Sequence, residues 1–463
     1  MIRDRLQAIQ NLETSLKLAR NADYVLLQFT DLFGLLKGRT IPAEETRNAL
    51  NEGVTFDGSS VLAGVKIEES DMIMKPDPDT FTACPHYFYD KSVATFMCDI
   101  LTPDGKQHEN DPRHICRKTI NKTQTEGYEP TTAAELEFYL VKKDAQGKIQ
   151  PVENHLSERQ RYFDNAPGRD TTETYRMDLT NALSTMGMTI ERQHHEVGSA
   201  QNEITFKYSD PLTTADNIIR YKFAAKAVAD KKYAWTATFM PKPWHGKPGS
   251  GMHIHLGLFN HATGRNPFYD PTSYGYVSQQ CRYFIGGLLN HAKALTAIVA
   301  PTINSHKRLV PGYEAPTYIA WSKRNRSALV RIPAFSPENE REARMEFRCP
   351  DPLSNPYLVF AATIEAGLDG IRKKTDPGDP IDTNLYHLND TERRKLGIQV
   401  LPATLKEALD EWKSDDICIH VLGKENADRY TDLKLQEWKE YERHMPQDAK
   451  EVTQWEIEKY LYA

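Results

Sequence analysis

The chain has 463 residues, of which 39% are hydrophobic, 10% aromatic and 26% charged. This composition is that of a globular protein and excludes the disordered and fibrous classes, and the length favours two domains over a single core. The formal net charge is -6 and includes no basic block, which argues against dedicated nucleic-acid binding. A small anionic substrate would therefore depend on local arginines.

Three features predict a cytoplasmic protein. The six cysteines are scattered singly, without a CxxC pair or a disulfide framework, as is usual in a reducing cytosol. Segment 1–20 alternates charges at helical spacing and lacks the uninterrupted apolar run of a signal peptide. The most apolar window, 283–303, contains Asn290, His291 and Lys293, so we expect a buried helix there and no membrane span.

The first hundred residues are expected to combine short strands and turns. After an opening amphipathic helix, segments 24–29 and 92–101 have the residue types of strands, and 31–38 those of a turn. The next helix has clear ends, because Asp111 suits an N-cap, Pro112 the first helical position and Gly127 the C-terminal stop. We place a domain boundary just before this helix, giving domains of residues 1–105 and 106–463.

The larger part of the chain is expected to mix helices and strands. Segment 216–231 has the pattern of a helix, whereas 134–141, 250–258 and 344–348 have that of strands. From about residue 389 the chain is strongly charged, and we expect a helical tail packed by its aromatic residues.

Four segments place ionisable residues two apart, the spacing that directs side chains to one face of a strand. Glu135 and Glu137 stand among apolar neighbours, where two carboxylates are costly unless a cation neutralises them. The pair by itself is also compatible with a strand that has one solvated face. A metal site therefore needs support from the other three segments.

The second and third segments supply further metal-ligand types. Glu196 and Glu203 flank the turn-like VGSAQN, which can fold back and bring both carboxylates to one point, as hard cations require. His253 and His255 share a strand face in GSGMHIHLGL. Neutral imidazole with several carboxylates is a reasonable mixed set for Mg²⁺ or Mn²⁺, although either histidine alone would more often be structural.

The fourth segment adds arginine to the carboxylates. Glu346 and Arg348 stand two apart in RMEFRCPDP, with Arg344 in the same register, and a surface cross-strand charge pair is the alternative reading. Two loops supply further arginines, because KRLVPGYEAP contains Arg308 and KRNRSALVRIP contains Arg324, Arg326 and Arg331. The planar guanidinium binds carboxylate or phosphate oxygens in two-pronged fashion, so these arginines indicate a phosphorylated, acidic substrate.

Charge balance connects these groups. The carboxylates outnumber the charges of a pair of divalent ions, and a nucleotide polyphosphate adds more negative charge, so the arginines must supply the balance. Several common nucleotide and metal motifs are missing: there is no GxxxxGK[ST] loop, no GxGxxG between a strand and a helix, and no HExxH. The residues by themselves predict a metal-dependent enzyme acting on phosphate, and leave its reaction open.

Six motifs resemble those of type I glutamine synthetases, in family order across nearly the whole chain. They are FDGSS (56–60), ESDM (69–72), HHEV (194–197), GSGMHIH (249–255), KRLVPGYEAP (307–316) and RNRSALVRIP (324–333). The resemblance implies an α+β fold, with an N-terminal β-grasp domain and a C-terminal catalytic domain made of an antiparallel sheet with helices. It also implies a homo-dodecamer of two stacked hexamers, with active sites between neighbouring subunits.

The resemblance assigns roles by motif position. One metal ion would be held by Glu137, Glu196 and Glu203, and a second by Glu135, His253 and Glu346. The glutamate carboxylates would be clamped by Arg308 and Arg348 with Gly249 beside them. Nucleotide contacts would come from Tyr162, Glu191, His255 and Arg344, and contacts with the transferring phosphate from Arg326 and Arg331.

The implied reaction forms glutamine in two steps. ATP phosphorylates the γ-carboxylate of glutamate, and ammonia then attacks the γ-glutamyl phosphate and releases phosphate, with two or three Mg²⁺ or Mn²⁺ ions per site. Asp57 from the adjacent subunit would take a proton from ammonium. Glu314 would close over the site as a lid, because water would otherwise hydrolyse the acyl phosphate. Nitrogen-regulatory proteins are further partners that the family suggests.

Some positions depart from the family pattern and leave two alternatives open. Pro248 stands where the family usually has Asn, Gly257 replaces a Ser, and Val65 stands where an aromatic residue is usual. A γ-glutamyl ligase that uses an organic amine is one alternative, although amine-using relatives often alter the pocket that contains Asp57. Tyr386 occupies a position that some relatives adenylylate, but its neighbours in NLYHL differ from the usual ones, so we do not expect that regulation.

The second alternative is a catalytically silent homologue that serves as a nitrogen-sensing scaffold. Silent homologues usually lose catalytic groups, whereas this chain retains Asp57, Glu314, Arg326 and every metal ligand that the resemblance assigns. The sequence therefore favours an active enzyme.

Overall fold

The computed structural model describes the whole chain except residues 1–10, 12, 63–64, 154–161, 167 and 314. Its N-terminal part is a sheet with strand order β2-β1-β6-β4-β3, in which β5 pairs with β6. Only the pairing of β1 with β6 is parallel among these strands. The elements are β1 (Tyr24–Thr30), β2 (Leu36–Pro42), α2 (Thr46–Glu52), β3 (Val54–Asp57), β4 (Asp71–Pro76), β5 (Thr82–Ala83) and β6 (Val93–Leu101).

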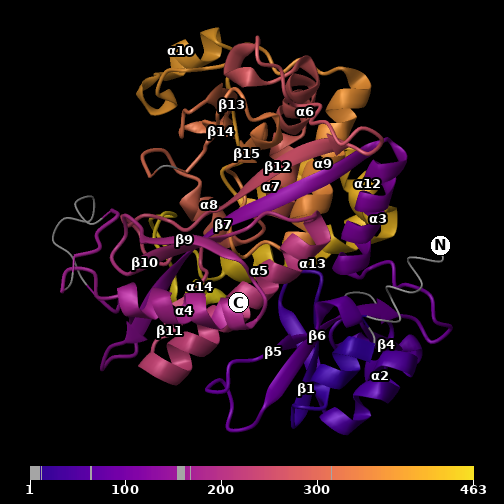
Figure 1. Ribbon diagram of the computed structural model, residues 1–463. Coiled ribbons are helices and arrows are strands. Elements are labelled where there is room, and N and C mark those ends of the chain that lie inside the picture. The colour runs from indigo at the N-terminus through magenta and orange to yellow at the C-terminus, as the bar shows by residue number, and fades with distance from the viewer. Residues whose placement is uncertain (1–10, 12, 63–64, 154–161, 167, 314) are drawn as a thin grey trace.

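Alternating apolar residues explain the first strand. Val25, Leu27 and Phe29 of β1 are buried, and they stand two apart, so they share one face of the sheet. This face packs against buried residues of the neighbouring strands, among them Met74 and Phe96. Figure 1 shows this part of the chain, in indigo, at the bottom of the molecule.

The larger sheet carries the segments with paired ionisable residues. Its strand order is β16-β13-β14-β15-β12-β7-β10-β9, with β8 and β11 paired to β7, and all pairings are antiparallel except that of β13 with β14. The strands are β7 (Tyr128–Lys143), β8 (Ile149–Pro151), β9 (Ile190–His195), β10 (Gln201–Phe206), β11 (Thr236–Thr238), β12 (Met252–Asn260), β13 (Tyr318–Lys323), β14 (Ala328–Ile332), β15 (Met345–Phe347) and β16 (Gln399–Val400).

Helices surround this sheet, and α9 is buried along most of its length. Helices α9 and α6 approach each other closely at glycines: a Cβ on Gly287 would lie 2.1 Å from the carbonyl oxygen of Ala366. The helices are α3 (Pro112–Thr125), α4 (Glu173–Thr185), α5 (Pro211–Tyr233), α6 (Gln279–Asn290), α7 (Ala292–Val299), α8 (Ile303–Arg308), α9 (Pro356–Lys373), α10 (Asp390–Lys395), α11 (Leu405–Ser414), α12 (Ile417–Leu422), α13 (Lys424–Glu442) and α14 (Gln454–Tyr460).

Most of the elements expected from the sequence are present. Helix α3 begins as predicted, because the side chain of Asp111 accepts a hydrogen bond from the backbone N–H of Arg113, and Gly127 follows the helix with a positive φ of 90°. The expected turn over 31–38 is too long, since β2 starts at Leu36 and pairs with β1.

The apolar window 283–303 is not one helix. It spans the end of α6, the whole of α7 and the first residue of α8, with breaks at His291 and at 300–302. His291 ends α6 with non-helical backbone angles, while its ring contacts two aspartates. None of the described helices is both long and apolar enough to cross a membrane.

Candidate active site

Strand pairing brings the predicted ligands together at the centre of the larger sheet. Glu137 of β7 lies opposite Glu203 of β10, and Glu135 of β7 lies opposite His253 of β12. Opposite residues in antiparallel strands point to the same face, and residues two apart on one strand do so too. The register of three strands therefore gathers four of these side chains on one face.

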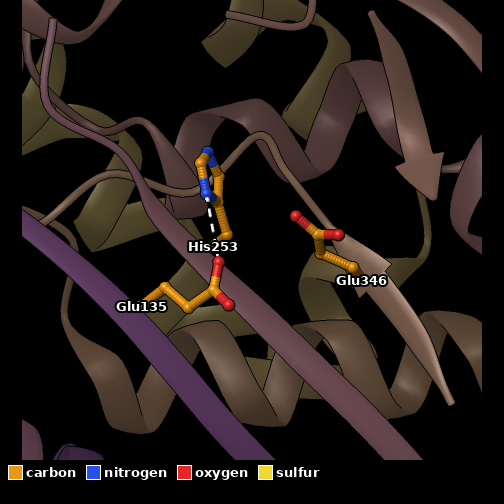
Figure 2. Close-up of side chains that lie close together, drawn as sticks. All are labelled: Glu135, His253 and Glu346. Carbon is orange, nitrogen blue, oxygen red and sulfur yellow. Dashed lines mark ion pairs between the residues drawn. The ribbon is translucent and has the colours of Figure 1, made fainter. Parts of the chain in front are cut away.

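Glu135, His253 and Glu346 form a group with the geometry of a metal site. One ligand atom from each lies within 4.8 Å of the others. Nδ1 of His253 is 3.7 Å from Oε2 of Glu135, and Figure 2 shows the three side chains converging from different strands. The sequence assigned these residues to one ion, and the structure brings them together.

The second group differs from the one expected. Its members with ligand atoms within 4.8 Å of one another are His194, Glu196 and Glu203. Nε2 of His194 lies 2.7 Å from Oε1 of Glu196 and 4.0 Å from Oε1 of Glu203. Sequence reasoning gave His194 no role, although it stands two residues before Glu196, the same spacing that identified the other pairs.

Glu137 lies beside both groups and belongs to neither. Its Oε2 accepts hydrogen bonds from the backbone N–H of Gly251 at 2.9 Å and from Nε2 of Gln201 at 3.1 Å. Its Oε1 lies 4.0 Å from Nδ1 of His253. The shared role of Glu137 with Glu196 and Glu203 stays a prediction, and in this structure protein donors hold one of the Glu137 oxygens.

The electrostatics of the first group suit a divalent cation. Burial, together with the nearby charge of Arg348, lowers the pKa of His253 to about 4, so its imidazole is neutral and able to act as a ligand. Burial opposes ionisation of Glu346, but Arg348, His255 and Arg331 outweigh it and bring the pKa of this carboxyl to about 2.

The other carboxylates repel one another. Burial and the charge of Glu196 raise the pKa of Glu137 to about 8, and burial with neighbouring carboxylates raises that of Glu203 as well. A compact set of buried carboxylates is costly without a compensating cation. The donor set therefore fits a hard divalent ion such as Mg²⁺ or Mn²⁺.

A cavity of about 760 Å³ joins the two groups to the arginines. The site residues predicted from the sequence that line it are Glu135, Glu137, Tyr162, Glu196, Glu203, Gly249, His253, His255, Arg308, Arg326, Arg331, Arg344 and Arg348. A smaller cavity of about 330 Å³ is lined by Glu191, and it shares His255 and Arg344 with the larger one. The residues expected to contact nucleotide thus extend over two adjoining hollows.

Two predicted residues are not among those that line these two cavities. Glu346 is fully buried and bonded to Arg331 and Arg348. Asp57 lies at the end of β3 and is not among the lining residues of either cavity. Glu314 is outside the described residues.

The wall formed by Arg308 is closely packed. Nη1 of Arg308 donates to the carbonyl of Cys349 at 2.7 Å, and its Nη2 donates to the carbonyl of Arg348 at 3.1 Å. A Cβ on Gly249 would lie 2.9 Å from Cγ of Arg308 and 2.6 Å from the carbonyl oxygen of Pro241. Only glycine fits there without displacing the arginine.

Asp57 presents an exposed, ionised carboxylate on the N-terminal part of the chain. Oδ1 accepts hydrogen bonds from the backbone N–H of Ser59 at 2.9 Å and from its hydroxyl at 2.6 Å, and Oδ2 accepts one from Ser60 at 2.7 Å. The hydroxyl groups of Ser59 and Ser60 hold the pKa of this carboxyl below its ordinary value. It is not among the described residues that line the 760 Å³ cavity.

Comparisons with known proteins match both parts of the chain. The model of the glutamine synthetase β-grasp domain matches residues 21–103, and that of the glutamine synthetase catalytic domain matches residues 109–460. Glutamine synthetases from Methanosarcina mazei and Thermotoga maritima are each 44% identical to this chain over 442 residues. These alignments cover 96% of this chain and 95% and 97% of the relatives.

Two solved structures share the fold over nearly their whole length. The chain described as "GmaS/ADP complex-Conformation 1" superposes with a TM-score of 0.81 at 28% identity, covering 97% of this chain and 99% of that one. A structure described as "Apo GmaS without ligand" gives the same TM-score at 29% identity, over 96% and 98% of the two chains. With both domains matched in order and relatives aligned over nearly its whole length, the chain belongs to the glutamine synthetase family.

Proposed function

We propose that this chain is a glutamate–ammonia ligase that forms L-glutamine from L-glutamate and ammonia, with ATP as the phosphoryl donor and γ-glutamyl phosphate as the intermediate. The observation that carries the proposal is the cavity in which two carboxylate–imidazole groups face a set of arginines. Relatives named glutamine synthetase, at 42–44% identity, support ammonia as the acceptor over an organic amine, and support catalysis over a silent sensing role.

Two metal positions follow from the side-chain groups. Glu135, His253 and Glu346 would hold one ion, and Glu196 and Glu203, with His194 or Glu137, the other. Two or three Mg²⁺ or Mn²⁺ ions bound there would neutralise the carboxylates and polarise phosphoryl oxygens.

The remaining residues bind and orient the substrates. Arg308 and Arg348 hold the carboxylates of glutamate, with Gly249 beside Arg308. Arg326 and Arg331 lie in the cavity where they balance the charge of the transferring phosphoryl group. The nucleotide occupies the hollows lined by Tyr162, Glu191, His255 and Arg344.

Two groups complete the site in the assembled enzyme. Asp57 of a neighbouring subunit takes a proton from ammonium, which leaves ammonia free to attack the acyl phosphate. Glu314 closes the site and excludes water. This arrangement goes with the homo-dodecamer of two stacked hexamers, which we propose together with a cytoplasmic location and regulation by nitrogen-regulatory proteins.

Phosphate release by the purified protein tests the proposal. The assay contains glutamate, ATP and Mg²⁺ or Mn²⁺, with either ammonium or one of a panel of alkylamines, and glutamine is measured directly. We expect phosphate and glutamine in equal amounts with ammonium. Release with an alkylamine but not with ammonium would show an amine ligase, and inactivity with every acceptor would support the silent sensing role.

A further inference from the structure

The C-terminal helix α14 reaches the active-site wall through one buried carboxylate. Glu456 is fully buried in the first turn of α14, where it forms a capping box with Thr453. Its Oε1 also accepts a hydrogen bond from Nδ2 of Asn304 at 3.0 Å, and its Oε2 pairs with Nζ of Lys307 at 2.5 Å. Both partners belong to α8, the short helix that ends at Arg308.

Asn304 extends this contact into the loop that carries Gly249. Its Oδ1 accepts a hydrogen bond from the backbone N–H of Lys242 at 2.7 Å, and its Nδ2 donates to the carbonyl of Lys242 at 2.9 Å. The Asn304 side chain thus bonds both the backbone N–H and the carbonyl of Lys242, and its Nδ2 also donates to Glu456. The adjacent carbonyl, of Pro241, is the one that closely approaches Gly249.

Lys307 ties the other end of α8 to the same helix. Its side chain is 6% exposed, it also donates to the backbone carbonyl of Glu451, and its Nζ lies 5.2 Å from the centre of the Tyr441 ring. Arg308, the next residue, lines the cavity and bonds to the carbonyl of Cys349. Helix α8 is therefore held between the C-terminal segment and the cavity wall.

We propose that Glu456 is a positioning residue, which fixes Arg308 and the Gly249 loop in the arrangement that receives the carboxylates of glutamate. The inference rests on the proposed function, in which Arg308 and Gly249 contact that substrate. Glu456 does not line the cavity and acts through Asn304 and Lys307. A buried ion pair with further hydrogen bonds restricts the relative position of the two elements, because separating the charges leaves each one buried and unpaired.

The substitution Glu456→Gln tests this coupling. We expect the KM for glutamate to rise about tenfold, while the KM for ATP changes by less than about twofold, because coupled neighbours affect only the network they share. Glu458→Gln is the matched control: Glu458 is exposed on the same helix, and its hydrogen bond among the described residues is with Gln454, also in α14. This control should leave both constants unchanged.

Hydrogen exchange adds a measurement that needs no activity. In Glu456→Gln the amides of α8 and of segment 242–251 should exchange faster, whereas those of β12 keep their wild-type rates. Should the single variant fail to fold, the double variant Glu456→Gln, Lys307→Met removes the ion pair without leaving a lone charge. It should show the same rise in the KM for glutamate.

The outcomes separate the inference from the proposed function. Unchanged exchange in α8, or an equal rise in both KM values with a fall in melting temperature, would overturn the positioning role. Absence of glutamine formation by the wild-type enzyme would overturn the proposed function instead, and the exchange experiment would still decide whether Glu456 holds α8.

Discussion

Gly249 shows how one missing side chain shapes the substrate site. The space that a Cβ would need is occupied by the Pro241 carbonyl on one side and by Cγ of Arg308 on the other. Since Arg308 is itself bonded to two backbone carbonyls, it cannot withdraw without losing those bonds. The glycine therefore sets the position of a guanidinium group that we propose as a glutamate ligand.

The substitution Gly249→Ala should weaken glutamate binding selectively. We expect the KM for glutamate to rise about tenfold. The new Cβ would displace the guanidinium of Arg308, and a misplaced binding group weakens substrate binding by an energy of this order. Gly257→Ala is the control: its Cβ would meet Oγ1 of Thr131 at 3.2 Å, beside the smaller cavity. Steady-state kinetics should show that the control leaves the KM for glutamate unchanged. A rise in the KM for ATP without a rise in the KM for glutamate would contradict the placement of Gly249 in the glutamate site.

Asp57, unlike Gly249, is exposed, and its hydrogen-bond partners Ser59 and Ser60 are its neighbours in the sequence. The substitution Asp57→Ala removes the proposed acceptor for the proton of ammonium but leaves the cavity of the same chain intact. We expect glutamine formation to fall, while glutamyl phosphate still forms. Positional isotope exchange in ATP, measured with glutamate present, detects that first step. Loss of exchange together with loss of synthesis would show that Asp57 acts earlier in the reaction.

At the scale of elements, His291 joins the ends of α6 and α7 to two further helices. It stands between α6 and α7, its Nε2 lies 3.0 Å from Asp369 of α9, and its Nδ1 lies 2.8 Å from Asp415, which follows α11. Burial opposes protonation of the ring, but the hydrogen bonds and charges of the two aspartates outweigh it and raise the pKa of His291. Burial also opposes ionisation of both aspartates, but hydrogen bonds from Lys373 and His291 lower the pKa of Asp369, and the hydrogen bond with His291 lowers that of Asp415.

These shifts predict how the contribution of His291 depends on pH. Its stabilising effect is fully present below the ordinary histidine pKa of about 6.5 and is lost as the pH rises through the higher folded value. The aspartates act in the other direction, because their contribution is lost as the pH falls below about 4. The difference in melting temperature between wild type and His291→Asn should be largest at about pH 5–6, between the ordinary pKa values of aspartate and histidine. It should be smaller in alkaline solution. A difference that grows with rising pH would contradict this account.

At the scale of the whole molecule, Arg113 connects the N-terminal sheet with a helix of the larger part. This buried arginine of α3 lies 2.8 Å from Asp77 and 2.5 Å from Asp99 of the N-terminal part, and 3.0 Å from Asp216 of α5. Asp216 also accepts a hydrogen bond from the hydroxyl of Tyr357 at 2.5 Å. We propose that residues 1–105 and 106–463 are the two domains and that this cluster fixes their junction.

Removal of Arg113 should destabilise the protein strongly. The substitution Arg113→Met leaves the buried Asp216 without its ion-pair partner, whereas Asp77 and Asp99 keep contacts with Arg117. Because an unpaired buried charge is costly, we expect a loss of about 3–5 kcal/mol in the free energy of unfolding. Lys118→Met, on the same helix, breaks an exposed pair with Glu109 and should cost less than about 1 kcal/mol. Urea unfolding measures both, and equal effects would show that the junction does not depend on the buried cluster.

The sequence by itself determined much of the site. Residues two apart on a strand must share a face, so the pairs at 135 and 137, at 253 and 255, and at 346 and 348 could be recognised without coordinates. The cap at Asp111 and the stop at Gly127 are local effects and were equally accessible. The order of six motifs then identified the family.

Only the tertiary structure decided which side chains meet. His194 enters the second ligand group because β9 pairs with β10 so that His194 lies opposite Glu203, a register that the separate segments do not specify. The hydrogen bond that Asn304 donates to Glu456 joins residues 152 positions apart. Spacing along the chain fixes the face on which a side chain lies, whereas such contacts depend on how distant elements pack, and packing is a property of the whole fold.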